Sequence, residues 1–184
     1  MSVGLFNGLP SHPLFVHGVV VLIPLTALAL VACTLWPTVA RRFSWPLPVL
    51  GLVTLALVVL TTESGEWLEE RVKETALVER HTEMGEGLTP WAIALFVLTT
   101  AVWWLGRVTA PRDPAKGDTV TPATSRRASS AVRLASSVPV RVAAVVLALA
   151  VTVGAVFEVY RIGDSGAKAV WQGEFTTGEP GAGQ

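Results

Sequence analysis

The chain is poor in charged residues and has almost no cysteine. Only 15% of its 184 residues are charged, the formal net charge is zero and the mean hydropathy is +0.54. Soluble domains carry about a quarter charged residues, so this composition argues against a soluble globular protein, and we expect no nucleic-acid partner. The single cysteine, Cys33, excludes an internal disulfide.

Basic residues are also missing from the start of the chain. The first one is Arg41, which follows a long apolar segment. A secretory signal has a positively charged start, so this arrangement favours a retained membrane span over a cleaved signal. The string Leu30-Val31-Ala32-Cys33 resembles a lipoprotein cleavage box. The position of the charge argues against lipidation, and we expect Cys33 to be a small packing residue.

Long apolar segments take the place of the missing charge. A membrane-spanning helix needs about 20 residues, and four blocks approach that length when their polar flanks are included. We therefore predict an all-α membrane protein with four transmembrane helices in one bundle, formed by residues 1–172 and followed by a disordered tail at 173–184. The predicted spans lie at about 13–36, 45–62, 90–106 and 142–160.

The charges that do occur are distributed unequally between the connections. Arg41 and Arg42 lie between the first two spans, and residues 107–141 carry seven basic against two acidic side chains, a net charge of +5. Residues 63–86 carry eight glutamates against three basic residues, a net charge of −5. Basic loops stay in the cytoplasm, so we predict both termini and the acidic connection outside a bacterial plasma membrane. We interpret about 108–137, rich in Pro, Ser, Thr and Ala, as a disordered cytoplasmic loop.

The acidic connection is predicted to contain an amphipathic helix that lies over the mouth of the bundle. His81 belongs to a helically spaced apolar stripe and should therefore point inward. Glycines at positions 85 and 87 predict that this helix ends soon afterwards, and Thr89-Pro90 predicts the start of the next one. The other members of the stripe are Leu77, Met84 and Leu88.

All three histidines are candidates for chemistry at the outer end. Ser11-His12-Pro13 has the pattern of a helix start, with Ser11 or His12 as the cap and Pro13 at the first helical position. His17 follows about one turn later, roughly 140° around the helix from His12, so the spacing alone does not imply a shared site. We predict that His17 and His81 line one outer cavity.

Two acidic residues are candidates at the same end. Glu158 lies in the last turn of the fourth span, where carboxylates are rare and usually paired or functional, and we predict that it packs near His17. Asp164 belongs to Gly163-Asp164-Ser165-Gly166, which we interpret as a turn that restarts an amphipathic segment. The same string surrounds the nucleophile of serine proteases, but four residues alone are a weak motif and do not favour hydrolysis.

Three motifs distinguish the outer end: His12-Pro13-Leu14-Phe15-Val16-His17, Arg80-His81 and Tyr160-Arg161-Ile162-Gly163-Asp164-Ser165-Gly166-Ala167. Together they resemble the bacterial membrane proteins catalogued as domain of unknown function 2231. The resemblance covers about residues 8–172 and implies a four-helix membrane fold without an established activity. Many relatives have a histidine where this chain has Asp164, so the resemblance implies one potential ligand fewer here.

The sequence as a whole favours a non-enzymatic structural or accessory membrane protein, with the lipid bilayer and a second copy or another membrane subunit as partners. One alternative is a haem or divalent metal site at the outer mouth, because imidazoles from separate helices hold haem iron and carboxylates help to bind divalent ions. The cofactor-binding candidates are His17, His81 and Glu158, and the metal candidates add His12 and Asp164. A small proton or ion conduit that uses the same groups is a further alternative.

Overall fold

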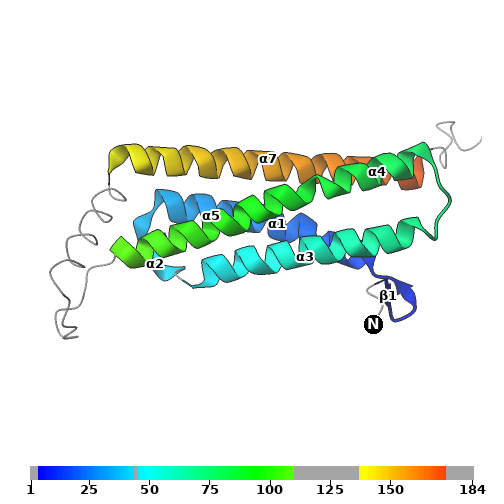
Figure 1. Ribbon diagram of the computed structural model, residues 1–184, viewed down its shortest axis with the longest axis horizontal. Helices are drawn as coiled ribbons and strands as arrows, with labels where there is room; N and C mark the ends of the chain where they lie inside the picture. Colours follow the sequence, from blue (N-terminus) through cyan, green and yellow to red (C-terminus); the bar gives the residue numbers. More distant parts are fainter. Residues whose placement is uncertain (1–3, 44, 110–136, 173–184) are drawn as a thin grey trace, which may run out of the picture.

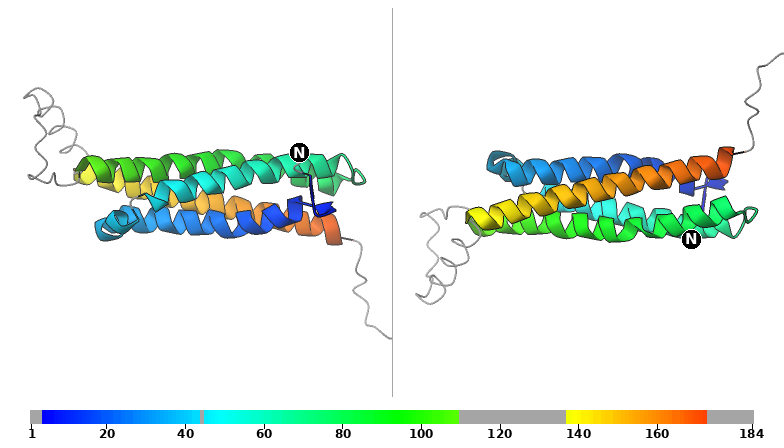
Figure 2. Two further views of the ribbon diagram at one scale, coloured as in Figure 1. Left: turned by 90° about the horizontal axis from the view of Figure 1, so that it is seen from below. Right: turned by 90° about the horizontal axis from the view of Figure 1, so that it is seen from above.

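The chain folds into an elongated bundle of long helices that lie side by side. The computed structural model describes residues 4–43, 45–109 and 137–172. The long helices run along one common direction, and a short hairpin lies at one end (Figure 1, and Figure 2 from two further sides). In chain order the elements are β1 (Leu5–Phe6), β2 (Leu9–Pro10), α1 (His12–Leu35), α2 (Pro37–Arg42), α3 (Pro46–Glu69), α4 (Ala76–Glu86), α5 (Leu88–Thr109) and α7 (Val138–Trp171).

Four segments of the described chain are long and apolar enough to cross a membrane: His12–Leu35, Pro46–Glu69, Ala76–Val108 and Val138–Trp171. The third contains α4 and most of α5, but four of the charged side chains fall in α4, so we treat α5 as its membrane-spanning part. The predicted all-α fold with four spans in one bundle is confirmed. The predicted loop at about 108–137 and the predicted tail at 173–184 lie almost entirely outside the described residues.

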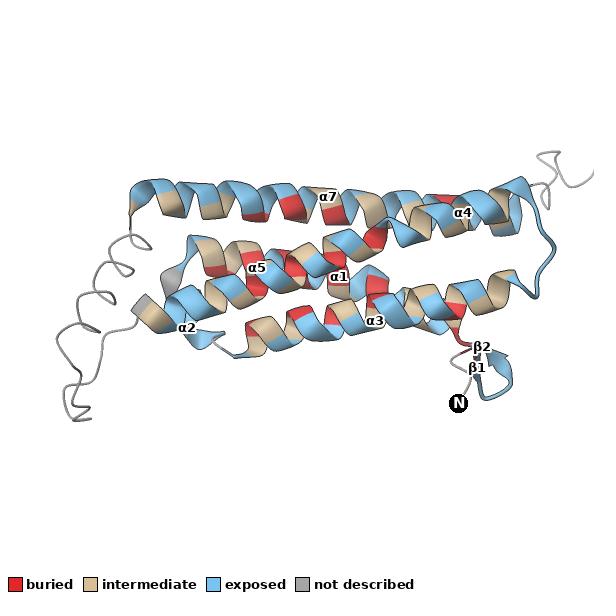
Figure 3. Ribbon diagram, in the orientation of Figure 1, coloured by how far each residue is buried: buried red, intermediate tan, exposed pale blue. Residues whose placement is uncertain are grey.

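The core is built from aliphatic and small side chains of the four long helices. Ile23, Ala27 and Leu30 of α1 are fully buried, as are Leu95 of α5 and Ala155 of α7. Small residues let the helix backbones approach closely, which is how spanning helices pack when lipid competes for the same apolar surface. Figure 3 shows that the buried positions face the inside of the bundle and the exposed positions face outward. Apolar residues on the outside, such as Val153, suit a lipid environment.

A pair of threonines lies inside this apolar core. The hydroxyl oxygens of Thr26 on α1 and Thr54 on α3 are 2.7 Å apart, and both residues are buried. Thr54 donates its own hydroxyl proton to the carbonyl of Leu50, so Thr26 must be the donor between the two threonines. The pair therefore connects α1 to α3 by a side-chain hydrogen bond within the spanning region.

Helix α4 does not lie across the bundle mouth as the sequence suggested. It follows nearly the same direction as α5, from which Gly87 separates it, and packs along the end of α7 (Figure 1). Thr75 caps its N-terminus by accepting a hydrogen bond from the backbone N–H of Val78. The expected inward direction of His81 is confirmed, because the residue is half-buried and lines a cavity between the helices.

The turn expected at Gly163-Asp164-Ser165-Gly166 is absent, because α7 continues as one helix to Trp171. Two glycines weaken a helix in isolation, but local bonds support this one. Asp164 and Lys168 form an ion pair of 2.6 Å at the favourable i, i+4 spacing. The Ser165 hydroxyl donates to the carbonyl of Ile162. Residues 163–166 thus form a contact surface between helices. Gly and Ser favour turns by local propensity, so this stretch of sequence alone does not predict the contact.

Candidate functional site

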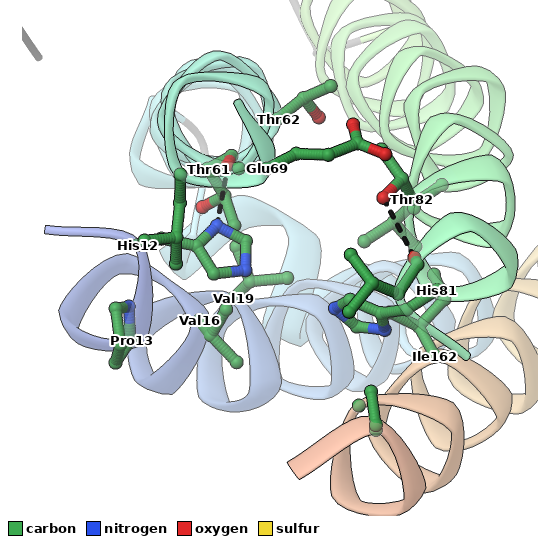
Figure 4. Close-up of a pocket in the computed structure, with 18 of the residues that line it drawn as sticks. His12, Pro13, Val16, Val19, Thr61, Thr62, Glu69, His81, Thr82 and Ile162 are labelled. Atoms are coloured by element: carbon green, nitrogen blue, oxygen red, sulfur yellow. Dashed lines mark hydrogen bonds between the residues drawn. The ribbon is translucent and has the colours of Figure 1, made fainter. Parts of the chain in front are cut away.

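The end of the bundle that carries the β1–β2 hairpin contains a cavity of about 670 Å³. Its walls come from the first turns of α1, the last turns of α3, the whole length of α4 and the last turns of α7 (Figure 4). The lining is mainly aliphatic, and two imidazole rings project into it from opposite sides. This volume falls in the range of small-molecule and cofactor sites, roughly 300 to 1,000 Å³, which are likewise apolar with a few placed polar groups. Aliphatic lining residues include Val16, Val19, Val58, Leu88, Val159 and Ile162.

His12 is the first residue of α1. Ser11 precedes it as the N-cap residue and Pro13 lies in the first turn, as the sequence predicted. The Nδ1 atom of His12 lies 3.0 Å from the carbonyl oxygen of Thr61 on α3. Gly65 makes this approach feasible, because a Cβ atom at that position would stand 3.1 Å from two atoms of the ring. The α3 backbone therefore fixes the ring of His12.

His81 is held in a similar way by α7. Its Nδ1 atom lies 2.9 Å from the hydroxyl of Ser165, which is buried. A Cβ atom at position 166 would stand 2.9 Å from Cε1 of the ring, so Gly166 provides the space that His81 occupies. Each ring thus lies against a glycine of the neighbouring helix, one turn or less from its hydrogen-bond partner.

The hydrogen bonds favour the same tautomer for both rings. The Thr61 carbonyl can only accept, so His12 donates from Nδ1. The hydroxyl proton of Ser165 is already donated to Ile162, so Ser165 accepts from Nδ1 of His81. In a neutral imidazole the other nitrogen then carries a lone pair. Both Nε2 atoms are accordingly acceptors, and no described residue donates a hydrogen bond to either of them.

The two rings form a pair across the cavity. Their centroids lie 6.3 Å apart, and their planes are inclined at 83°. The ring nitrogen of His12 that makes no hydrogen bond is turned across the cavity toward His81 (Figure 4). A transition-metal ion binds imidazole nitrogen at about 2 Å, so one ion between two rings places their centroids roughly 6 Å apart. The observed separation matches that arrangement.

His17 lines the same cavity, which confirms the expectation that His17 and His81 share one. Its side chain is exposed, and its Nδ1 atom donates to the carbonyl of Pro13, one turn earlier in its own helix. The ring is thus held by α1 alone, whereas His12 and His81 are each held by a second helix.

The two acidic candidates are not among the residues that line this cavity. Glu158 accepts from Arg161 at 3.2 Å, its side chain is 14% exposed, and it lies near Gly87 at the junction of α4 and α5. The structure gives Glu158 and His17 no hydrogen bond or ion pair with each other. Asp164 is paired with Lys168 on another face of α7.

His81 lies in α4, outside the membrane-spanning segments, and its surroundings disfavour its charged form. Burial lowers the pKa of His81 below 6.5, and the nearby charge of His12 lowers it further. The nearby backbone carbonyl of Ile162 has a smaller, opposite effect on this pKa. A neutral imidazole is the form that binds metal ions.

A bare metal ion would find too few protein ligands here. Among the described residues, no three His, Cys, Asp or Glu side chains are close enough together to hold an ion. A metal in a macrocycle already has four ligands, and two imidazoles can supply the remaining two. The site can therefore hold a flat metal-bearing cofactor, and its apolar walls suit one.

Sequence reasoning placed His12, His17 and His81 at this end but overlooked the residues that orient them. Thr61 contributes a backbone carbonyl, which leaves no signature in its side chain. Gly65 is the signal that was available, because it is a glycine in a helical pattern without a turn to explain it. Gly166 was assigned to a turn, and its role becomes visible only in the continuous helix α7. Both glycines mark the points where another group approaches the helix backbone.

One comparison identifies the family. Residues 8–179 match the family described as "Predicted membrane protein (DUF2231)". The chain belongs to this family. No curated protein and no solved structure matches it. The family description agrees with the four spans, and it carries no activity, substrate or cofactor that bears on the two-histidine cavity.

Proposed function

We propose that this DUF2231 protein binds a haem in its outer cavity, with His12 and His81 as the two axial ligands of the iron. The observation that carries the proposal is the pair of imidazole rings at 6.3 Å, each with its Nδ1 atom hydrogen-bonded to a second helix. Metal-binding histidines almost always donate their second ring N–H to a carbonyl, carboxylate or water, which fixes the tautomer and orientation. His12 is oriented in this way by a carbonyl of α3, and the Ser165 hydroxyl of α7 orients His81.

The chemistry follows from the ligand set. A haem held by His12 and His81 would supply one-electron exchange between the ferric and ferrous states. It would not favour oxygen binding or catalysis, because the two imidazoles would fill the positions that oxygen or a substrate would need. The apolar walls would set the reduction potential through burial, and the charged lining residues would set it through nearby charge. These charged residues are Glu66, Glu69, Lys73 and Glu86. A haem-carrying subunit of a larger membrane assembly also satisfies the accessory role that the sequence favours.

The charge distribution along the chain supports a position of the site at the outer face of the membrane. Arg41, Arg42 and the net charge of +5 on residues 107–141 favour the cytoplasm for the opposite end of the bundle. We place the two-histidine cavity at the outer face of a bacterial plasma membrane, with both termini on that side. Electron exchange would then occur with donors and acceptors outside the cytoplasm or within the outer leaflet.

The test is haem reconstitution of purified protein in detergent. We expect one haem per chain and, after reduction, the sharp absorption bands of low-spin six-coordinate iron. His12→Ala and His81→Ala should each lose the six-coordinate spectrum and weaken binding at least tenfold. His17→Ala is the matched control, because it removes a third imidazole from the same cavity and should leave the spectrum unchanged.

A rescue experiment separates ligation from folding. In His81→Gly, added imidazole should enter the vacated space and restore the six-coordinate spectrum. Absence of haem binding by the unmodified chain, or equal binding by all three alanine variants, would refute the proposal. Stoichiometric metal without a porphyrin spectrum would instead support a non-haem ion.

A further inference from the structure

A second, smaller hollow of about 160 Å³ lies on the other side of the α4–α7 contact. It is lined by three basic side chains, Arg80 from α4 and Arg161 and Lys168 from α7, and by the hydroxyl-bearing Tyr160 and Ser165. Asp164 is the one acidic residue in its lining. Leu77 and Met84 complete the walls.

The charges in this hollow are only partly compensated. Lys168 is paired with Asp164 at 2.6 Å, and Arg161 with Glu158 at 3.2 Å. Arg80 forms no ion pair with any described residue. Its guanidinium carries five N–H donors in a planar fork that matches the oxygens of phosphate. The hollow therefore keeps a positive charge with hydrogen-bond donors around a space of limited size.

The hollow lies where the helices leave the apolar part of the bundle. The apolar stretch of α7 ends at Phe157, and the basic residues follow over the next three turns. Tyr160 is 71% exposed and Trp171 is 55% exposed. Amphipathic aromatic rings are enriched at the level of the lipid headgroups, so these two side chains indicate that depth for the hollow.

We propose that the hollow binds a phosphate group, with Arg80 as its principal ligand and with Arg161, Lys168 and Tyr160 as further donors. The same chemistry occurs in the headgroup of an anionic phospholipid and in free phosphate. The depth of the hollow favours the lipid headgroup. The site is independent of the haem proposal, although Ser165 borders the hollow and accepts a hydrogen bond from His81.

The experiment compares the full chain in nanodiscs of phosphatidylcholine alone and with phosphatidylglycerol added. A ligand that binds only the folded state raises the melting temperature. We expect phosphatidylglycerol to raise it by a few degrees and native mass spectrometry to retain one phosphatidylglycerol per chain. A parallel arm adds inorganic phosphate to the protein in neutral detergent. If only the lipid raises the melting temperature, the ligand is the lipid headgroup. If inorganic phosphate at millimolar concentration raises it as well, the ligand is a soluble anion.

The decisive variant is Arg80→Gln, and the matched control is Arg71→Gln. Arg71 is another exposed arginine at the same end, paired with Glu70 outside the hollow. Both variants lose one positive charge, so a general attraction to an anionic surface affects them equally. We expect Arg80→Gln to lose the shift and the retained lipid, and Arg71→Gln to keep both. Equal shifts in the two variants, or no shift in the unmodified chain with either phosphate source, would overturn the proposal. If Arg80→Gln itself lowers stability, the number of phosphatidylglycerol molecules retained per chain in native mass spectrometry still measures binding.

Discussion

His12 and His81 face each other across one cavity, with 6.3 Å between their ring centroids and 83° between their planes. They come from α1 and α4, and each is fixed by a neighbouring helix, α3 for His12 and α7 for His81. The site thus draws on four helices. A change in the packing of these helices would alter the distance between the two rings, so a loss of packing here would also weaken the proposed haem binding.

The glycine beside His81 provides the sharpest test of that geometry. Gly166→Ala introduces a Cβ atom 2.9 Å from Cε1 of the ring, so His81 or α7 must shift. We expect haem affinity to fall at least tenfold, although alanine favours a helix over glycine by about 1 kcal/mol. The measurement is a haem titration followed by absorbance.

Gly106→Ala is the control for this substitution. Gly106 lies in α5 and does not line the cavity, and a Cβ atom there meets no atom within 4 Å. We expect unchanged haem affinity and equal or slightly higher thermal stability, because the helix gains propensity without a clash. If both variants bind haem like the unmodified chain, the ring of His81 is not confined by α7.

Acid should weaken the apo fold through His81. Its pKa in the folded state lies below the unfolded value of 6.5, so the unfolded chain binds more protons between the two values. The contribution of His81 to stability is therefore complete above about pH 6.5. It is lost as the pH falls from there through the folded pKa, with a slope of at most about 1.4 kcal/mol per pH unit. Unfolding in detergent at several pH values, followed by circular dichroism, measures this slope.

His81→Gln isolates the contribution of this residue. Glutamine does not titrate, so the difference in unfolding free energy between the two proteins should shrink as the pH falls through this window. His17→Gln is the matched control, because it removes an exposed imidazole from the same cavity. A parallel pH dependence in all three proteins would assign the acid sensitivity to other groups.

Much of the fold was predictable from the sequence, because apolar length and loop charge are local properties. The four spans follow from them, and the start of α1 follows from Ser11 and Pro13. The straight course of α7 was not predictable in this way. Gly163 to Gly166 look like a turn when read alone, and their role depends on His81 approaching from α4. That contact lies between residues far apart in the chain.

The candidate site was predictable only in part for the same reason. His17 was favoured because of its depth in the first span, and His81 because of its apolar stripe. His12 was a weaker candidate, because the sequence pattern does not assign a residue at the start of a helix to one side of that helix. Its orientation comes from the Thr61 carbonyl, a contact across 49 positions of sequence. In the sequence itself, both histidine contacts are marked by a glycine, Gly65 for His12 and Gly166 for His81.

The buried threonine pair should contribute measurably to stability. Thr54→Val removes the acceptor of the Thr26 hydroxyl and leaves that group buried without its interhelical partner. We expect a loss of about 1 kcal/mol, in the range measured for hydrogen bonds between membrane helices. Thr26→Val should cost a similar amount. The double variant should cost less than the sum of the two single losses, because both partners of one bond are then removed.

The control for the threonine pair is Thr34→Val, since Thr34 bonds only to the carbonyl of Leu30 in its own helix. It should be close to neutral. Unfolding in mixed micelles with increasing denaturing detergent provides the free energies. Additive losses in the double variant would show that the two hydroxyls do not act as a pair.

Orientation in the membrane is tested by labelling single cysteines in intact cells. Cys33→Ser first removes the native thiol, which is buried in α1. In that background, Glu70→Cys should react with a membrane-impermeant thiol reagent, because the acidic connection is predicted outside. Ser129→Cys should react only after the cells are opened, because the basic connection is predicted to lie in the cytoplasm. Labelling of Ser129→Cys in sealed cells would reverse the orientation and place the two-histidine cavity at the cytoplasmic face. Electron donors and acceptors for a haem there would then have to be sought inside the cell.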